Sequence, residues 1–379
     1  MLTKEEFLTL RRAALERYFS RMNDRQREAV FQTEGALLIL AGAGSGKTTV
    51  LINRIANLVR FGNAYHATDM PPFVSPQQEE KLRAVATGAA KIDDETAALL
   101  AVDPCPAWQV LAITFTNKAA GELRERLSRM LGSAGEEVMA GTFHSFCARI
   151  LRRDGAPLGY SAHFTIYDTD DSRRLMKDCM KALNIDEKFL GHRAVLAEIS
   201  HAKDSLLSPA DYAKLPEVTG NVRLQAVARC YALYQSRLKE ADAMDFDDLL
   251  CRVIDLFEQC PEIADHYRRR YPYIMVDEYQ DTNHAQYRLV SLLAEGNGNL
   301  CVVGDDDQSI YKFRGATIEN ILNFENEFKD CAVIRLEQNY RSTQNILDAA
   351  NAVIAHNVNR KGKTLWTENA VRSEERRVG

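Results

Sequence analysis

"LILAGAGSGKTTVLINRI", residues 38–55, joins a short apolar run to a helix-period segment through a glycine-rich turn. Glycines let consecutive backbone N–H groups converge on a phosphate, and the first turn of the helix adds the positive end of its dipole. Lys47 can reach the outer phosphates of a nucleotide, and the Thr48 hydroxyl can ligate magnesium. The stretch therefore predicts a phosphate loop between a buried strand and a helix.

The loop departs from the pattern GxxxxGK[ST] at its first position, where Ala41 replaces the usual glycine. Alanine is small enough to keep the loop. The alternative is a glycine-rich turn with an exposed lysine, which the order of strand, loop and helix disfavours. We expect one continuous segment to bind the nucleotide: Ala41, Gly42, Ala43, Gly44, Ser45, Gly46, Lys47, Thr48 and Thr49.

A second stretch, "YIMVDEYQDT" (273–282), ends an apolar run on two adjacent carboxylates, Asp277 and Glu278. Adjacent carboxylates at a buried strand end are costly to desolvate unless a cation, a proton or a partner charge compensates them. In phosphate-loop enzymes a second strand delivers an Asp to the magnesium shell. We therefore expect Asp277 to balance the ion and Glu278 to polarise the attacking water. A solvated strand end is the alternative interpretation of this pair.

Short apolar runs alternate with helix-period segments along the chain, which is typical of a parallel sheet covered by helices. The runs expected to form strands are 36–41, 110–115, 273–277, 300–305 and 332–336. Between 142 and 270 the strand signal disappears, so we expect an inserted all-helical domain there. A second insertion is expected at 61–108, where five of the ten prolines surround one short helix. The predicted fold class is α/β, a P-loop NTPase with a parallel sheet covered by helices.

Composition narrows the class of protein less than the motifs do. The chain has 379 residues, of which 46% are hydrophobic and 27% charged, and this length suggests two or three domains. A net charge of -5 excludes a protein that is basic all over but allows a local basic groove. The eight cysteines contain no CxxC pair, and no segment approaches the roughly 18 apolar residues of a membrane span. We expect a cytoplasmic protein with reduced thiols and no membrane contact.

Eight motifs follow one another in the order of a known helicase family: "MNDRQREAV" (22–30), "AGAGSGKTT" (41–49), "AITFTNKAA" (112–120), "GTFHSFCARIL" (141–151), "MDFDDLL" (244–250), "VDEYQDTN" (276–283), "GDDDQSIYKFRGA" (304–316) and "LEQNYRSTQNIL" (336–347). On these motifs the chain resembles the UvrD/PcrA/Rep branch of superfamily-one DNA helicases. The resemblance implies a first RecA-like ATP-binding domain at 1–141 and 271–335, and a helical accessory domain at 142–270. It also implies that 336–371 opens a second RecA-like domain. The tail "RSEERRVG" (372–379) resembles the translation of a common sequencing adapter, and we expect it to be an artefact outside the fold.

The resemblance also assigns roles around the nucleotide. Gln26 would read adenine, because its side-chain amide offers one donor and one acceptor to the base edge, and Tyr340 would stack on the base. Gln308 would contact the γ-phosphate or the water, and Arg341 would act as an arginine finger. The implied cofactors are ATP and Mg²⁺, with the ion held by Thr48 and Asp277. The catalytic residues expected are Lys47, Glu278, Gln308 and Arg341.

Single-stranded DNA is the partner that the resemblance implies. The expected contacts near the strand ends are Phe115, Thr116, Asn117, Thr142, Phe143 and His144, and those after Gln308 are Tyr311, Phe313 and Arg314. Base–aromatic stacking is worth about 1–3 kcal/mol per base. Taken alone, these aromatic residues would be ordinary core residues, and His144 a structural histidine. Because Gln308 adjoins the DNA contacts, a shift at the nucleotide would displace them.

The implied function is ATP-driven 3′ to 5′ translocation on single-stranded DNA, with unwinding at single/double-strand junctions during repair or replication. The chain itself is expected to bind ATP and DNA weakly, because its second motor domain is incomplete. Two alternatives stay open: the motor subunit of a recombination helicase–nuclease, and a non-catalytic, nucleotide-gated DNA-binding module. The sequence specifies no protein partner.

Overall fold

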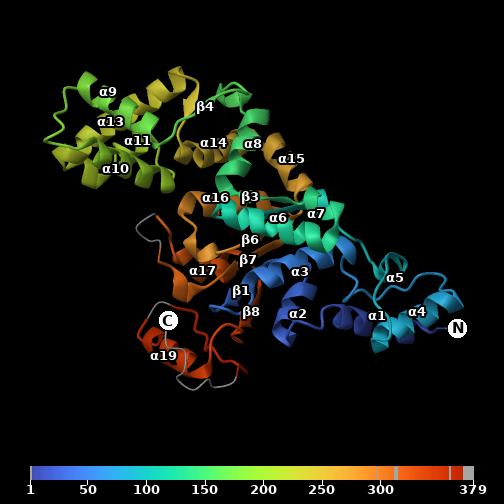
Figure 1. The fold of residues 1–379 in the computed structure, drawn as a ribbon. Helices are drawn as coiled ribbons and strands as arrows, with labels where there is room; N and C mark the ends of the chain where they lie inside the picture. The colour runs from blue at the N-terminus through green and yellow to red at the C-terminus, as the bar shows by residue number, and fades with distance from the viewer. Residues whose placement is uncertain (1, 297, 311–314, 358–359, 370–379) are drawn as a thin grey trace, which may run out of the picture.

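The computed structural model describes residues 2–296, 298–310, 315–357 and 360–369 (Figure 1). Its centre is a six-stranded sheet with the order β3-β2-β6-β7-β1-β8, in which every neighbouring pair is parallel. The strands are β1 (Leu37–Ala41), β2 (Val110–Thr114), β3 (Met139–Thr142), β6 (Tyr273–Val276), β7 (Leu300–Gly304) and β8 (Ala332–Leu336). This sheet and the helices around it confirm the predicted α/β fold class.

Parallel pairing brings the carboxyl ends of the central strands to one edge of the sheet. Val276 of β6 lies opposite Val302 of β7, and Leu40 of β1 lies opposite Gly304 of β7. The segments that follow these three strands therefore emerge next to one another. In open α/β sheets this edge is where ligands bind.

Both faces of the sheet are buried, which explains why its strands are nearly continuous apolar runs. Alternate residues of β1 point to opposite faces. Leu38 and Leu40 belong to one core layer, and Leu37 and Ile39 belong to the other. The helices and 3-10 turns that accompany the sheet are α1 (Lys4–Tyr18), α2 (Asp24–Phe31), α3 (Lys47–Arg60), η1 (Ala107–Gln109), α6 (Asn117–Leu131), α7 (Ser133–Glu137), η3 (Tyr279–Asp281), α16 (His284–Ala294), η4 (Asp306–Gln308), α17 (Glu319–Leu322) and α18 (Phe324–Glu327).

Helices dominate the segment that follows β3, and part of it lies away from the sheet. Figure 1 shows α9, α10, α11 and α13 as a group. These helices have a separate core, in which Met176, Ile199 and Tyr234 are buried. The elements here are α8 (Phe143–Asp154), η2 (Ala156–Leu158), β4 (Thr165–Ile166), α9 (Thr169–Ala182), α10 (His192–Asp204), α11 (Pro209–Tyr212), α12 (Pro216–Thr219), α13 (Val222–Glu240), β5 (Ala243–Met244), α14 (Phe246–Gln259) and α15 (Pro261–Arg270). The expectation of helices alone was wrong in one detail, because β4 and β5 form a short parallel pair. Each of these strands has only two residues, which is too short for a recognisable alternation of apolar and polar residues.

The segment 61–108 contains two helices, α4 (Pro76–Thr87) and α5 (Asp94–Leu100), so the expectation of one short helix was wrong. Ser75 caps α4 in a capping box, and Pro76 occupies its first turn, where its missing N–H costs nothing. Proline at this place starts a helix rather than breaking one. α4 packs on α1.

The C-terminal segment returns to the phosphate loop. β8 joins the sheet beside β1, and α19 (Gln344–Ile354) follows it. The Tyr340 N–H donates to the Gly44 carbonyl at 3.0 Å. None of the helices in the described ranges is long and apolar enough to cross a membrane.

Candidate active site

The predicted phosphate loop connects β1 to α3 with the backbone that its glycines permit. Gly44 and Gly46 have φ angles of 68° and 87°, a region that side chains with a Cβ rarely adopt. The Ser45 hydroxyl closes the turn by donating to the Gly42 carbonyl at 2.7 Å. Gly46 precedes Lys47 without a side-chain cap on α3, so the first N–H groups of that helix can face an anion.

Lys47 and Glu278 form an ion pair across the carboxyl edge of the sheet. The Lys47 Nζ lies 2.8 Å from Glu278 Oε2, and the two side chains are 13% and 40% exposed. Glu278 has a φ of 51°, a left-handed conformation that costs a non-glycine residue about 1–3 kcal/mol. This backbone strain lies at the point where β6 ends, as is common at functional sites.

Asp277 is buried beside this pair and fits a hard cation. Burial and the neighbouring Glu278 charge raise the pKa of Asp277 to about 6, and Lys47 opposes that shift. Its Oδ1 accepts from the Glu278 N–H at 3.0 Å, but within the described part of the chain Asp277 forms no salt bridge. A buried carboxylate that lacks an ionic partner among the described residues is a suitable oxygen ligand for Mg²⁺.

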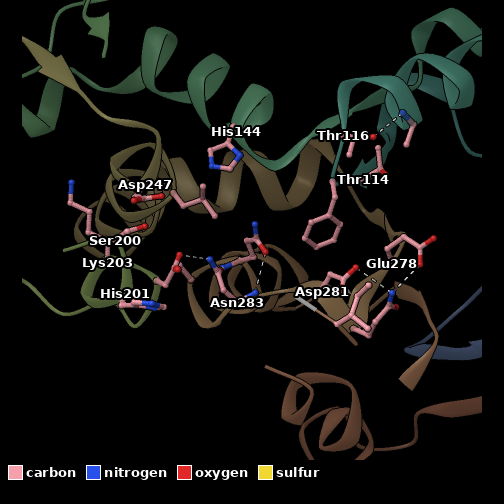
Figure 2. Close-up of a pocket in the computed structure, with 18 of the residues that line it drawn as sticks. Thr114, Thr116, His144, Ser200, His201, Lys203, Asp247, Glu278, Asp281 and Asn283 are labelled. Atoms are coloured by element: carbon pink, nitrogen blue, oxygen red, sulfur yellow. Dashed lines mark hydrogen bonds between the residues drawn. The ribbon is translucent and has the colours of Figure 1, made fainter. Parts of the chain in front are cut away.

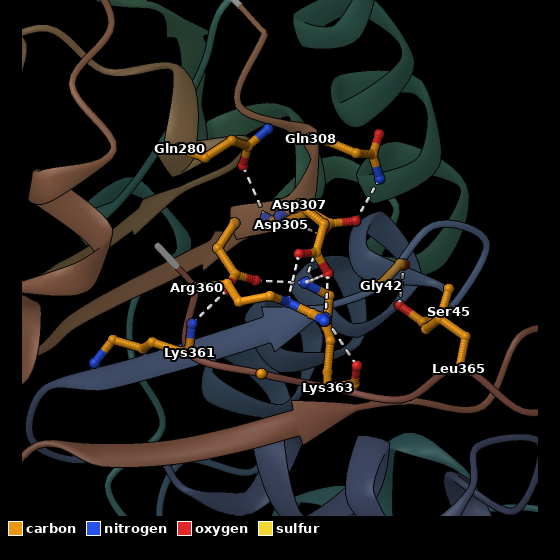
Figure 3. Close-up of polar contacts among 12 residues, drawn as sticks. Gly42, Ser45, Gln280, Asp305, Asp307, Gln308, Arg360, Lys361, Lys363 and Leu365 are labelled. Atoms are coloured by element: carbon orange, nitrogen blue, oxygen red, sulfur yellow. Dashed lines mark hydrogen bonds and ion pairs between the residues drawn. The ribbon is translucent and has the colours of Figure 1, made fainter. Parts of the chain in front are cut away.

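Two residues that the sequence interpretation missed connect Glu278 to Gln308. Gln280 donates to Glu278 Oε2 at 3.0 Å. Its Oε1 accepts from the Asp305 N–H at 2.9 Å (Figure 3). The Gln308 amide in turn donates to Asp305 Oδ2. Gly304 permits this approach, because a Cβ there would lie 2.9 Å from Gln280 Oε1. The available signal was that Asp305, like Asp277, directly follows a buried strand.

Gln26 and Tyr340 both contact the phosphate loop, and Asn23 lies between them. Gln26 Nε2 donates to the Ser45 carbonyl at 2.8 Å, and its Oε1 accepts from the Asn23 N–H at 3.1 Å. The Asn23 side chain donates to the Tyr340 hydroxyl at 2.8 Å. Tyr340 is 49% exposed, so part of its side chain is accessible to a base.

Arg341 is held near the loop through Asn339. The Asn339 Nδ2 donates to the Ala43 carbonyl, and its Oδ1 accepts from the Arg341 N–H at 2.8 Å. Across the loop, Arg126 of α6 donates to Thr49 Oγ1 at 3.0 Å. Asn339 and Arg126 were not predicted, because their approach depends on the tertiary fold.

A cavity of about 930 Å³ is lined both by two predicted catalytic residues and by three of the predicted DNA contacts (Figure 2). We call it the shared cavity. Its lining includes Phe115, Thr116 and His144, and also Glu278 and Gln308. Figure 2 shows Thr116 and Glu278 at one end and Asp247 and Lys203 at the other. Predicted nucleotide and DNA residues therefore line one space.

Three of the predicted DNA contacts lie elsewhere in the structure. Phe143 is only 1% exposed and packs edge-on against Phe115, so the prediction that its ring lines the groove was wrong. Thr142 is buried and caps α8, and Asn117 begins α6 outside the cavity lining. The predicted contacts Tyr311, Phe313 and Arg314 lie outside the described residues.

Acidic side chains line both ends of the shared cavity, Asp281 near Glu278 and Asp247 near Lys203 (Figure 2). Burial and the charge of Asp247 raise the pKa of Asp204 to about 7, and burial with the Glu278 charge raises the pKa of Asp281 to about 6. Burial lowers the pKa of His144. A neutral carboxyl group repels a DNA phosphate less than a carboxylate does, so the raised pKa of Asp204 weakens this repulsion near neutral pH.

Comparison with known proteins identifies the protein family to which the chain is similar. The UvrD/REP helicase N-terminal domain matches residues 22–68 and 89–329, and the UvrD-like helicase C-terminal domain matches 334–378. The chain is 46% identical over 349 residues to "ATP-dependent DNA helicase PcrA" of Leuconostoc citreum, covering 92% of this chain and 41% of that protein. It is 46% identical over 350 residues to the protein of that name in Bacillus subtilis (strain 168), again covering 92% of this chain and 41% of that protein. The chain thus spans about two fifths of the length of these curated relatives.

Proposed function

The chain belongs to the UvrD/Rep helicase family, and from this membership we propose that it is the N-terminal part of an ATP-dependent DNA helicase. The whole protein would move 3′ to 5′ on single-stranded DNA and unwind junctions in repair or replication. The observation that carries the proposal is the shared cavity, in which Glu278 and Gln308 line the same space as Phe115 and Thr116. Hydrolysis and DNA contact would therefore take place side by side.

ATP would bind along the phosphate loop. The backbone N–H groups of the loop and of the first turn of α3 would receive the phosphates, and Lys47 would exchange Glu278 for a phosphate oxygen. Gln26 and Tyr340, which are both hydrogen-bonded to Asn23, would bind the adenine. Thr48 and Asp277 would hold Mg²⁺, which supplies charge neutralisation for the triphosphate.

Glu278 would act once Lys47 has turned to the phosphate. The released carboxylate can then orient and polarise the attacking water, while Gln280 keeps its position through the 3.0 Å hydrogen bond. Gln308 would contact the γ-phosphate or the water. Arg341 would stabilise the transferring phosphoryl group, a role worth roughly 10³–10⁵ in turnover where it has been dissected.

DNA bases would enter the shared cavity and stack on Phe115, with Thr116 and His144 as polar neighbours. Tyr311, Phe313 and Arg314 remain proposed contacts. The domain division at 1–141 with 271–335, 142–270 and 336–371 is part of the proposal, as is a cytoplasmic location. A non-catalytic module is disfavoured because Lys47, Asp277, Glu278 and Gln308 are all present.

Steady-state phosphate release tests the proposal. We expect low, Mg²⁺-dependent ATP turnover that oligo(dT) stimulates weakly, and we expect Asp277→Asn to abolish it. Release that persists in Asp277→Asn, or in the presence of a chelator, would show that the activity does not arise at this site.

A further inference from the structure

Basic residues after α19 lie directly on the acidic turn that follows β7 (Figure 3). The Lys363 Nζ is 2.7 Å from Asp305 Oδ1 and 2.8 Å from Asp307 Oδ2, and it also contacts Asp306 Oδ1. The Arg360 guanidinium donates to Asp307 at 2.9 Å. Three adjacent carboxylates with this spacing resemble a metal site, but here an ammonium group contacts all three.

This ion cluster is buried, unlike an ordinary surface ion pair. The side chains of Lys363 and Asp305 are each only 2% exposed. Burial alone would lower the pKa of Lys363, but the Asp305 charge and the hydrogen bonds of the three carboxylates raise it overall. A charged lysine that is held this way fixes its partners, because removing one member of a buried pair leaves an uncompensated charge.

Asp305 connects Lys363 to the candidate catalytic residues Gln308 and Glu278. Its Oδ1 binds Lys363, while its Oδ2 accepts from Gln308. Its backbone N–H donates to Gln280 at 2.9 Å, and Gln280 donates to Glu278 at 3.0 Å. Polar contacts therefore connect Lys363 to Gln308 through one intervening residue, Asp305. They connect Lys363 to Glu278 through two, Asp305 and Gln280.

We propose that Lys363 is a positioning residue for ATP hydrolysis, acting through Asp305 on Gln308 and, through Gln280, on Glu278. This inference rests on the proposed function. Lys363 itself does not line the shared cavity and touches no candidate catalytic residue. A displacement of the segment 360–363 from the turn 305–307 would move Asp305, and with it Gln308 and Glu278.

The test compares Lys363→Met with Lys361→Met in the 379-residue chain. Lys361 is a matched control, because its side chain pairs with Glu325 rather than with the buried carboxylates. We expect Lys363→Met to lower kcat at least tenfold while KM for ATP changes less than threefold, and Lys361→Met to stay within twofold of the wild type. Lys363→Arg should recover kcat to within threefold, because it restores the charge.

Gln280→Ala makes the inference testable even if Lys363→Met fails to fold, because it cuts the connection from Asp305 to Glu278 outside the ion cluster. We expect a lower kcat with little change in KM, because only the connection to Glu278 is lost. A wild-type kcat in Gln280→Ala, or equal losses in Lys363→Met and Lys361→Met, would overturn the inference alone. A wild-type chain without ATP turnover would overturn both the inference and the proposed function.

Discussion

Glu278→Gln should separate ATP binding from ATP hydrolysis. Glu278 Oε2 accepts from Lys47 at 2.8 Å and from Gln280 at 3.0 Å. Glutamine has the same size and keeps one oxygen that can accept both bonds, but it carries no charge. Because a bound phosphate must take Lys47 away from Glu278, the substitution removes a competitor of the phosphate.

The size of each effect follows from the geometry. Two unit charges 2.8 Å apart attract by about 1.5 kcal/mol in water, and the 40% exposure of Glu278 lowers the net value of the pair to about 0.2–1 kcal/mol. Removing it should raise ATP affinity roughly 1.5- to 5-fold. Loss of the group that polarises water should lower kcat by about 10²–10⁴.

Fluorescent ATP analogue binding and steady-state phosphate release measure the two effects separately. Glu125→Gln is the matched control, because Glu125 pairs with Arg129 on the exposed surface of α6. It should change neither quantity. Weaker ATP binding by Glu278→Gln, or a kcat within threefold of the wild type, would refute the assignment of Glu278.

Three further predictions concern the base, the DNA and pH. Gln26→Ala should lower the preference for ATP over GTP about 2- to 12-fold in competition binding, while Gln78→Ala, which removes the same capping role from α4, should not. Phe115→Ala should weaken oligo(dT) binding roughly 5- to 150-fold by fluorescence anisotropy, and equal weakening by Phe189→Ala, at an exposed ring outside the cavity lining, would contradict the role. Burial raises the pKa of Asp204 from 3.8 to about 7, so its neutral form stabilises the fold at low pH and this contribution is lost as pH rises through 7. Asp204→Asn should therefore raise Tm more at pH 8 than at pH 5, and an equal rise at both would count against the shift.

The sequence predicted the elements whose signal is local. β1, β2, β6, β7 and β8 are apolar runs of four or five residues followed by helical patterns, and each was found within one residue of its expected bounds. β3 was missed, because "MAGT" is short and contains glycine. It is a strand because β2 pairs with it in the folded sheet.

In the candidate site, too, the sequence predicted the residues in contiguous motifs but not the contacts that depend on the tertiary fold. The phosphate loop and the pair Asp277 and Glu278 are contiguous motifs, so their chemical roles could be predicted from the sequence alone. The contact of Gln280 with Asp305 joins residues 25 positions apart, and that of Lys363 with Asp306 joins residues 57 apart. Phe143 was misassigned, because residue type alone does not tell whether an aromatic ring faces the core or a groove.

The central claim is that the loop carrying Lys47 and the acidic pair bind a nucleoside triphosphate together. Isothermal titration calorimetry of Mg²⁺–ATP into the wild-type chain and into Lys47→Ala tests it most directly, with Lys81→Ala, at an exposed lysine of α4, as control. We predict binding by the wild type and by Lys81→Ala, and an affinity at least about tenfold lower for Lys47→Ala, since a charge-assisted contact is lost. Equal affinities in all three chains, or no heat of binding in the wild type, would contradict the account.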